Sequence, residues 1–166
     1  MPTTAITLAV ETATNWTNAS NALVSDGATA TCTQTGPSSA QISFTTNAST
    51  VIPANAIVTH ILVTARLRVN SASATRRFYL REVGYKQFGG DGSPYAAEPV
   101  ATTLTTYTLC NVPISELGLT QENCRGPLVF RHYLTSGNTM HIDHIGLTFT
   151  WLEPPSGSGM FFGENF

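Results

Sequence analysis

An alternation of apolar and polar side chains between residues 57 and 69 is the feature that most limits what this chain can fold into. Side chains alternate between the two faces of a β-strand, so a period of two predicts a long strand with one dry face. Pro53 precedes this strand, at a place where no ladder hydrogen bond is needed from its nitrogen. The predicted inner face comprises Ile57, Ile61, Val63, Ala65, Leu67 and Val69, and the outer face Val58, His60, Leu62, Thr64, Arg66 and Arg68.

Most of the remaining chain follows the same pattern. β-branched and aromatic residues dominate further segments, which turn-forming pairs such as Asp26-Gly27 and Gly126-Pro127 separate. The further predicted strands are 28–33, 41–46, 76–83, 102–111, 128–135 and 140–151. Strands at this spacing predict an all-β fold, namely an antiparallel, jelly-roll-like β-sandwich.

Local patterns add detail to this fold. Residues 128–151 are expected to form a hairpin, and its second strand is expected to turn Ile145, Leu147, Phe149 and Trp151 inward. The only helical candidate is 114–118, with one turn at most. The predicted organisation is a β-sandwich domain over residues 1–152, followed by an extended C-terminal docking tail over residues 153–166.

The composition indicates a surface that other proteins cover. A chain of 166 residues is long enough to bury a core without disulfides or metal. Only 11% of its residues are charged, against about 25% in ordinary globular proteins. A surface with so few charges is poorly protected against association. We therefore expect the chain to form homo-oligomers and to bind at least one other protein.

Charge and hydropathy exclude several classes of partner. The net charge of −2 and the isoelectric point near 6.0 provide no general attraction to nucleic acid or to an anionic membrane. No apolar run approaches the roughly 20 residues that a membrane span needs. Residues 1–16 also lack the basic start of a signal peptide. We expect a soluble protein that binds neither nucleic acid nor membrane.

Cys32, Cys110 and Cys124 do not have the spacing of metal-binding cysteines. An odd and scattered set favours buried or partly buried free thiols. A disulfide between Cys110 and Cys124 would close a plausible loop and stays open as an alternative.

The densest polar cluster is His141, Asp143 and His144. In a regular strand His141 and Asp143 point the same way, as zinc ligands or an acid–base pair must, while His144 points to the opposite face. A zinc site would need two more ligands, and His60 and His132 belong to no supporting motif. We favour a structural role, with Asp143 hydrogen-bonded at the entry to the strand, and expect no metal.

Motifs of catalysis are missing from the sequence. It has no GxSxG elbow, and no cysteine has the neighbours of a catalytic thiol. The glycine-rich stretch 89–92 lacks the Lys-Ser/Thr and the helix of a phosphate-binding loop. The expectation is a protein that is not an enzyme, with no catalytic residues and no cofactor.

A long loop and the tail lie outside the predicted sandwich. Residues 84–100 contain several glycines and prolines together with Tyr85, Phe88 and Tyr95, and such long loops are usually functional or disordered. These aromatics would pack on their own domain, contact another subunit or stack on a sugar ring. The tail has a Pro-Pro start, a Ser/Gly spacer and an apolar end. Its candidate contact residues are Met160, Phe161, Phe162 and Phe166, which would dock on a neighbouring subunit or fold back on their own domain.

Residues 16–27 (WTNASNALVSDG), the Ile52-Pro53 entry into the long strand and residues 142–151 (IDHIGLTFTW) together resemble small jelly-roll structural proteins of tailed bacteriophages. The resemblance covers most of residues 11–152 but neither residues 84–100 nor the FFGENF end. It implies a non-enzymatic virion protein that acts through subunit contacts, with capsid decoration or cement as the expected role. A tail or fibre component and a carbohydrate-binding module are the alternatives. The resemblance supplies no catalytic residues.

Overall fold

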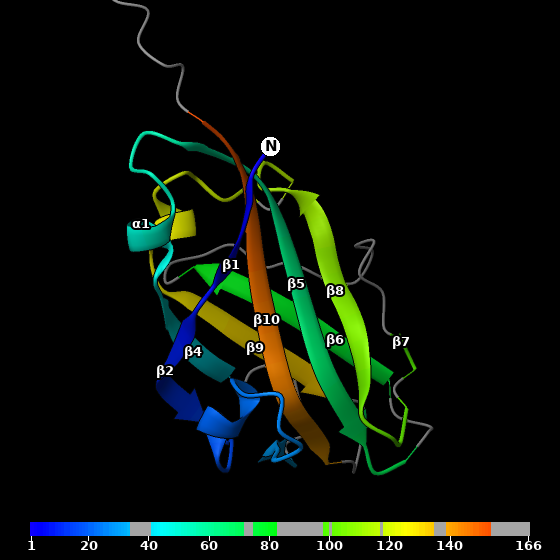
Figure 1. The fold of residues 1–166 in the computed structure, drawn as a ribbon. Helices are drawn as coiled ribbons and strands as arrows, with labels where there is room; N and C mark the ends of the chain where they lie inside the picture. Colours follow the sequence, from blue (N-terminus) through cyan, green and yellow to red (C-terminus); the bar gives the residue numbers. More distant parts are fainter. Residues whose placement is uncertain are drawn as a thin grey trace, which may run out of the picture.

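The chain folds into two β-sheets that pack face to face (Figure 1). The computed structural model describes residues 1–33, 41–71, 75–82, 98–99, 101–116, 118–134 and 139–153. The first sheet, here called the β5 sheet, has the order β1 (Thr3–Ile6), β10 (Met140–Leu152), β5 (Ile57–Val69) and β8 (Thr105–Pro113), with β3 (Ala30–Cys32) also beside β10. The second, the β9 sheet, has the order β2 (Leu8–Thr14), β4 (Gln41–Thr46), β9 (Leu128–Leu134), β6 (Thr75–Glu82) and β7 (Glu98–Pro99).

The strand order is that of a jelly roll. From β3 onward, one sheet has the order β3-β10-β5-β8 and the other β4-β9-β6-β7, so the chain repeatedly crosses from one sheet to the other. All of these pairs are antiparallel. This order is the double Greek key of an eight-stranded jelly roll. The prediction of an all-β, antiparallel sandwich is therefore confirmed.

The predicted hairpin over residues 128–151 is wrong. β9 pairs with β4 and β6, whereas β10 pairs with β1, β3 and β5 in the opposite sheet. Turn-forming residues specify that the chain reverses, but they do not specify whether the returning strand pairs with its predecessor or packs across the core. Sequence patterns also missed β1, β2 and the short β7, which lies inside the predicted loop.

The first strands close one edge of the sandwich. β1 pairs with β10, and after Thr7 the chain continues as β2, which pairs with β4 in the other sheet. Asn47 holds this crossing point because its Oδ1 accepts from the Thr7 N–H at 2.9 Å, while its own N–H donates to the Thr7 carbonyl at 3.2 Å. Asn47 also precedes α1 (Ala48–Val51), a helical turn absent from the sequence prediction. The predicted helical candidate at 114–118 is a turn over its described residues.

Two apolar clusters fill the space between the sheets. One contains Ile61, Val63, Leu147 and Phe149, and the other contains Leu67 with further residues such as Ile142. The predicted inner face of β5 is correct from Ile61 to Val69 but wrong at its start, where Val58 is buried and Ile57 is half exposed. The register pairs Val58 with Trp151 and His60 with Thr150, so Thr59 is an extra residue. This bulge reverses the alternation.

A side-chain amide extends the β5 sheet beyond the end of β8. Gln121 accepts from the Val58 N–H at 2.7 Å and donates to the Val58 carbonyl at 2.8 Å. Nearby, Arg125 donates to the carbonyls of Pro53, Ala56 and Gln121. The segment around the 3₁₀ turn η2 (Asn123–Arg125) is thereby fixed to the start of β5.

The cysteines match the expectation of thiols in the interior. Cys32 and Cys124 are buried and Cys110 is partly buried, and the three form no disulfide. Burial raises the pKa of the Cys110 thiol to about 11, so this group stays protonated at neutral pH. The alternative of a Cys110–Cys124 bridge is not realised.

Candidate functional site

A β-bulge in β10 places the polar residues that the sequence singled out. β10 pairs Ile142 with Leu67 and His144 with Arg66, which leaves Asp143 as the extra residue. His141 and His144 are therefore both partly exposed on the outer side of the sheet, and Asp143 is buried. The expectation that His144 lies on the face opposite His141 is wrong, because it assumed a regular strand.

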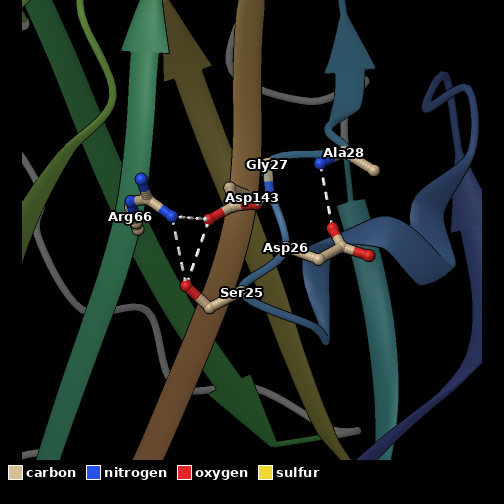
Figure 2. A network of polar contacts seen from close by, with 6 residues as sticks. All are labelled: Ser25, Asp26, Gly27, Ala28, Arg66 and Asp143. Carbon is tan, nitrogen blue, oxygen red and sulfur yellow. Dashed lines mark hydrogen bonds and ion pairs between the residues drawn. The ribbon is translucent and has the colours of Figure 1, made fainter.

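The Asp143 carboxylate is the centre of a polar network between β10, β5 and the loop before β3 (Figure 2). Its oxygens accept hydrogen bonds from Arg66 Nη1 at 2.7 Å, the Gly27 N–H at 2.6 Å and the Ser25 hydroxyl at 3.3 Å. Arg66 Nη1 also lies 3.2 Å from the Ser25 hydroxyl. A fully buried carboxylate thus has one charged partner and two neutral donors, as a buried charge requires.

The loop before β3, which contains Ser25 and Gly27, has the backbone conformation that these hydrogen bonds to Asp143 require. Gly27 has a φ of 89°, a left-handed value that glycine adopts without steric cost. Asp26 Oδ1 accepts from the Ala28 N–H at 2.9 Å, which forms a local turn. Leu23 forms a bridge with His144. The network therefore fixes the segment between η1 (Ala19–Ala22) and β3 against the edge of β10.

His141 takes part in a second set of contacts at the same end of β10. Its Nε2 lies 2.9 Å from Asn70 Oδ1, and its Nδ1 lies 3.3 Å from the Thr29 hydroxyl. Burial and the nearby Arg68 guanidinium lower the pKa of His141 below its usual value. Both ring nitrogens already have protein partners, so His141 is better placed to hold Asn70 and Thr29 against β10 than to transfer a proton to a ligand.

The other residues considered for a metal site lie apart from this cluster. His60 is on β5 and His132 is on β9 of the opposite sheet. Within the described residues, no group of three or more His, Cys, Asp or Glu side chains could hold a metal ion. Asp143 itself has no exposed surface through which it could contact a ligand.

The predicted contact residues Tyr85, Phe88, Tyr95, Met160, Phe161, Phe162 and Phe166 lie outside the described residues. Their roles remain predictions. The described part of the chain instead presents an extended outer surface on the β5 sheet.

We call the central part of this surface the neutral face. It consists of the outward-pointing residues on four adjacent strands, and none of them is Asp, Glu, Lys or Arg. Its members are Thr3 and Ala5 on β1, Gly146, Thr148 and Thr150 on β10, His60, Leu62 and Thr64 on β5, and Thr108, Asn111 and Pro113 on β8. Strand alternation predicted part of this set, but only the register between strands shows that its members are neighbours.

The two ends of the neutral face differ in character. At one end Ile57 is paired with Leu152, and they are 50% and 40% exposed. The bond from the Trp151 N–H to the Pro2 carbonyl brings Met1, which is 77% exposed, to the same end. At the opposite end Arg66 and Arg68 pair with His144 and His141. The surface thus passes from apolar through neutral to basic along the strands.

None of the helices in the described ranges is long and apolar enough to cross a membrane. No protein-family model matches the chain, and searches of curated proteins and of solved structures return no significant match.

Proposed function

We propose that this chain is a non-enzymatic structural protein of a tailed bacteriophage that decorates or cements the capsid through subunit contacts. The observation that carries the contact function is the neutral face. Charged residues are depleted at the centres of protein interfaces, and this face has none across four strands. The location in a virion rests on the resemblance of residues 16–27 and 142–151 to phage proteins.

The side chains of the neutral face suit a surface that becomes buried. Threonine is stiff at χ1 in a strand, so it has little rotamer freedom to lose on contact. Thr3, Ala5, Thr108 and Asn111 are exposed, and Leu62 is half-buried at the centre. The jelly roll is also an architecture of viral capsid domains, although a fold shared by many functions supports this proposal less than the surface does.

Labelled-antibody electron microscopy on purified particles tests the proposed location. We expect label at regular positions over the capsid. Label confined to the tail or to the fibres would show that the protein is a tail or fibre component and not a capsid decoration protein. Unlabelled particles would overturn the virion assignment.

A charge placed on the neutral face tests the contact surface itself. Thr148→Lys introduces a charge at the centre of the face and is expected to reduce incorporation into particles, because burying an unpaired charge is costly. Thr103→Lys is the matched control, since Thr103 is exposed in the turn before β8 and outside the face. Equal incorporation of both variants, with unchanged melting temperatures, would show that this face makes no contact.

The carbohydrate-binding alternative depends on the loop aromatics. A triple variant with serine at Tyr85, Phe88 and Tyr95 separates the two functions. A glycan array on which the wild type binds and the triple variant does not would establish sugar binding. No glycan signal from the wild type, together with particle incorporation, is the result expected for a structural protein.

A further inference from the structure

We infer that the neutral face of one copy binds residues 160–164 (MFFGE) of a second copy, an inference that rests on the proposed function and names the partner of that surface. Leu62 at the centre of the face would contact the apolar residue Met160, and Phe162 would lie on the same side of the extended segment. Glu164 would pair with the basic end of the face at Arg66 and Arg68. The described chain ends at Glu153, beside the apolar end of the same sheet.

The spacing of groups on the segment matches the spacing on the face. Leu62 and Arg66 are four residues apart on β5, which is about 13 Å along a strand. Met160 and Glu164 are also four residues apart, so an extended segment would place both pairs in contact together. The remaining residues under the segment, such as Thr64 and Gly146, are small and uncharged. The order of apolar and acidic groups on the segment therefore fits the order of neutral and basic groups on the face.

The basic end has capacity for an acidic partner. Arg66 is 37% exposed, and a single nitrogen, Nη1, makes its contacts with Asp143 and Ser25. Arg68 pairs with no carboxylate within the described part of the chain. Negative charge from Glu164 would thus meet two guanidinium groups, of which only that of Arg66 forms an ion pair among the described residues.

The segment is long enough to reach the basic end of a face. From Leu152 to the level of Arg66, which is beside His144, the path along β10 is about 26 Å at the usual strand rise. The twelve residues 153–164 span at most about 40 Å, so chain length permits binding to the face of a second copy and to the segment's own face. The second copy follows from the proposed function, in which another subunit covers this face, and the mixing experiment below distinguishes the two arrangements.

Charge reversal in full-length protein tests the pairing. Arg68→Glu on the face and Glu164→Arg on the segment are each expected to weaken self-association by about tenfold or more in sedimentation velocity, because each places like charges together. Glu11→Arg is the matched control, since Glu11 is exposed on β2 of the other sheet, and it should associate as the wild type does. Arg68 is preferred to Arg66 because its replacement leaves the Asp143 ion pair intact.

A mixture of the two deficient variants distinguishes binding between copies from binding within one copy. In the mixture, the segment of the Glu164→Arg variant meets an opposite charge on the face of the Arg68→Glu variant. The Arg68→Glu variant keeps Glu164 on its segment, and this residue meets the unchanged Arg68 on the face of the Glu164→Arg variant. We expect the mixture to associate with nearly the wild-type constant. If the segment lay on its own face, mixing would restore nothing, and that result would overturn the inference. A wild-type chain that stays monomeric at all concentrations would overturn it as well.

Particle binding separates this inference from the function on which it rests. If Arg68→Glu self-associates normally while Thr148→Lys fails to join particles, the inference fails and the structural function stands. If no variant and no wild-type protein binds particles, the proposed function fails regardless of self-association.

Discussion

Arg66 and Asp143 form an ion pair whose two ends lie in different environments. The carboxylate of Asp143 has no exposed surface, whereas the Arg66 side chain is 37% exposed. Loss of the arginine would leave a charge in the interior, but loss of the carboxylate charge would leave a guanidinium that water can reach. The two partners are therefore unequal in what their removal costs.

Replacing Arg66 with alanine is expected to lower the free energy of unfolding by about 3 kcal/mol, the lower end of the range for breaking a buried pair. Asp143→Asn keeps an acceptor for the Gly27 N–H and should cost less, about 1–2 kcal/mol. Urea denaturation measures both values. The double variant should be more stable than Arg66→Ala alone, because it removes the unpaired carboxylate. An Arg66→Ala variant no less stable than Asp143→Asn would contradict this account of the network.

Gln121 acts as a substitute for a neighbouring strand at Val58. Replacing it with alanine leaves both backbone groups of Val58 without this partner and is expected to cost about 2 kcal/mol. Gln121→Glu keeps an acceptor for the Val58 N–H, but its carboxylate would face the Val58 carbonyl without a proton to donate. This variant should therefore be about as unstable as Gln121→Ala. Glu122→Ala changes the adjacent exposed side chain and should shift the unfolding free energy by less than about 0.5 kcal/mol. Equal losses for the substitutions at residues 121 and 122 would show that the two hydrogen bonds between the Gln121 side chain and Val58 contribute nothing to stability.

The pKa of His141 makes stability depend on pH. Burial and Arg68 lower this pKa below its ordinary value of 6.5 in the folded state, so the unfolded chain binds the proton more tightly. The contribution of neutral His141 to the free energy of unfolding is therefore present above about pH 6.5, and it is lost as the pH falls toward the pKa of His141 in the folded state. Urea midpoints measured between about pH 7.5 and pH 5 should decrease more for the wild type than for His141→Gln. Parallel decreases in both proteins would exclude His141 as the cause.

The sequence predicted the strands best where their alternation is strong and uninterrupted. β5 and β4 have the predicted bounds, and the inner residues of β10 from Ile145 to Phe149 are buried as expected. β2 was missed because most of its residues are exposed, so it has little apolar alternation. The bulges at Thr59 and Asp143 could not be predicted because one inserted residue reverses the alternation without any signal in composition.

The candidate site was accessible to sequence reasoning only in part. Asp143 was expected to form structural hydrogen bonds, and it does. Its ion pair joins residues 77 positions apart, and no local pattern specifies so distant a partner. The neutral face depends on the register of four strands, which turn residues and periodicity do not fix.

The division of the core into two clusters predicts which substitutions act independently. Leu67 and Ile142 are paired neighbours in one cluster, whereas Ile61 belongs to the other and lies six residues from Leu67 along β5, or about 20 Å. Leu67→Ala should cost about 2–5 kcal/mol on its own. Combined with Ile61→Val, the two losses should add to within about 0.5 kcal/mol, because distant sites share no cavity. When Leu67→Ala is combined with Ile142→Val, the loss in unfolding free energy should differ from the sum of the two single losses by about 0.5 kcal/mol or more, because both substitutions enlarge the same cavity. The mild Ile→Val changes keep the double variants folded, so guanidinium denaturation can measure all of them. Additivity with Ile142 and coupling with Ile61 would reverse the assignment of Leu67 and show that the interior is organised differently.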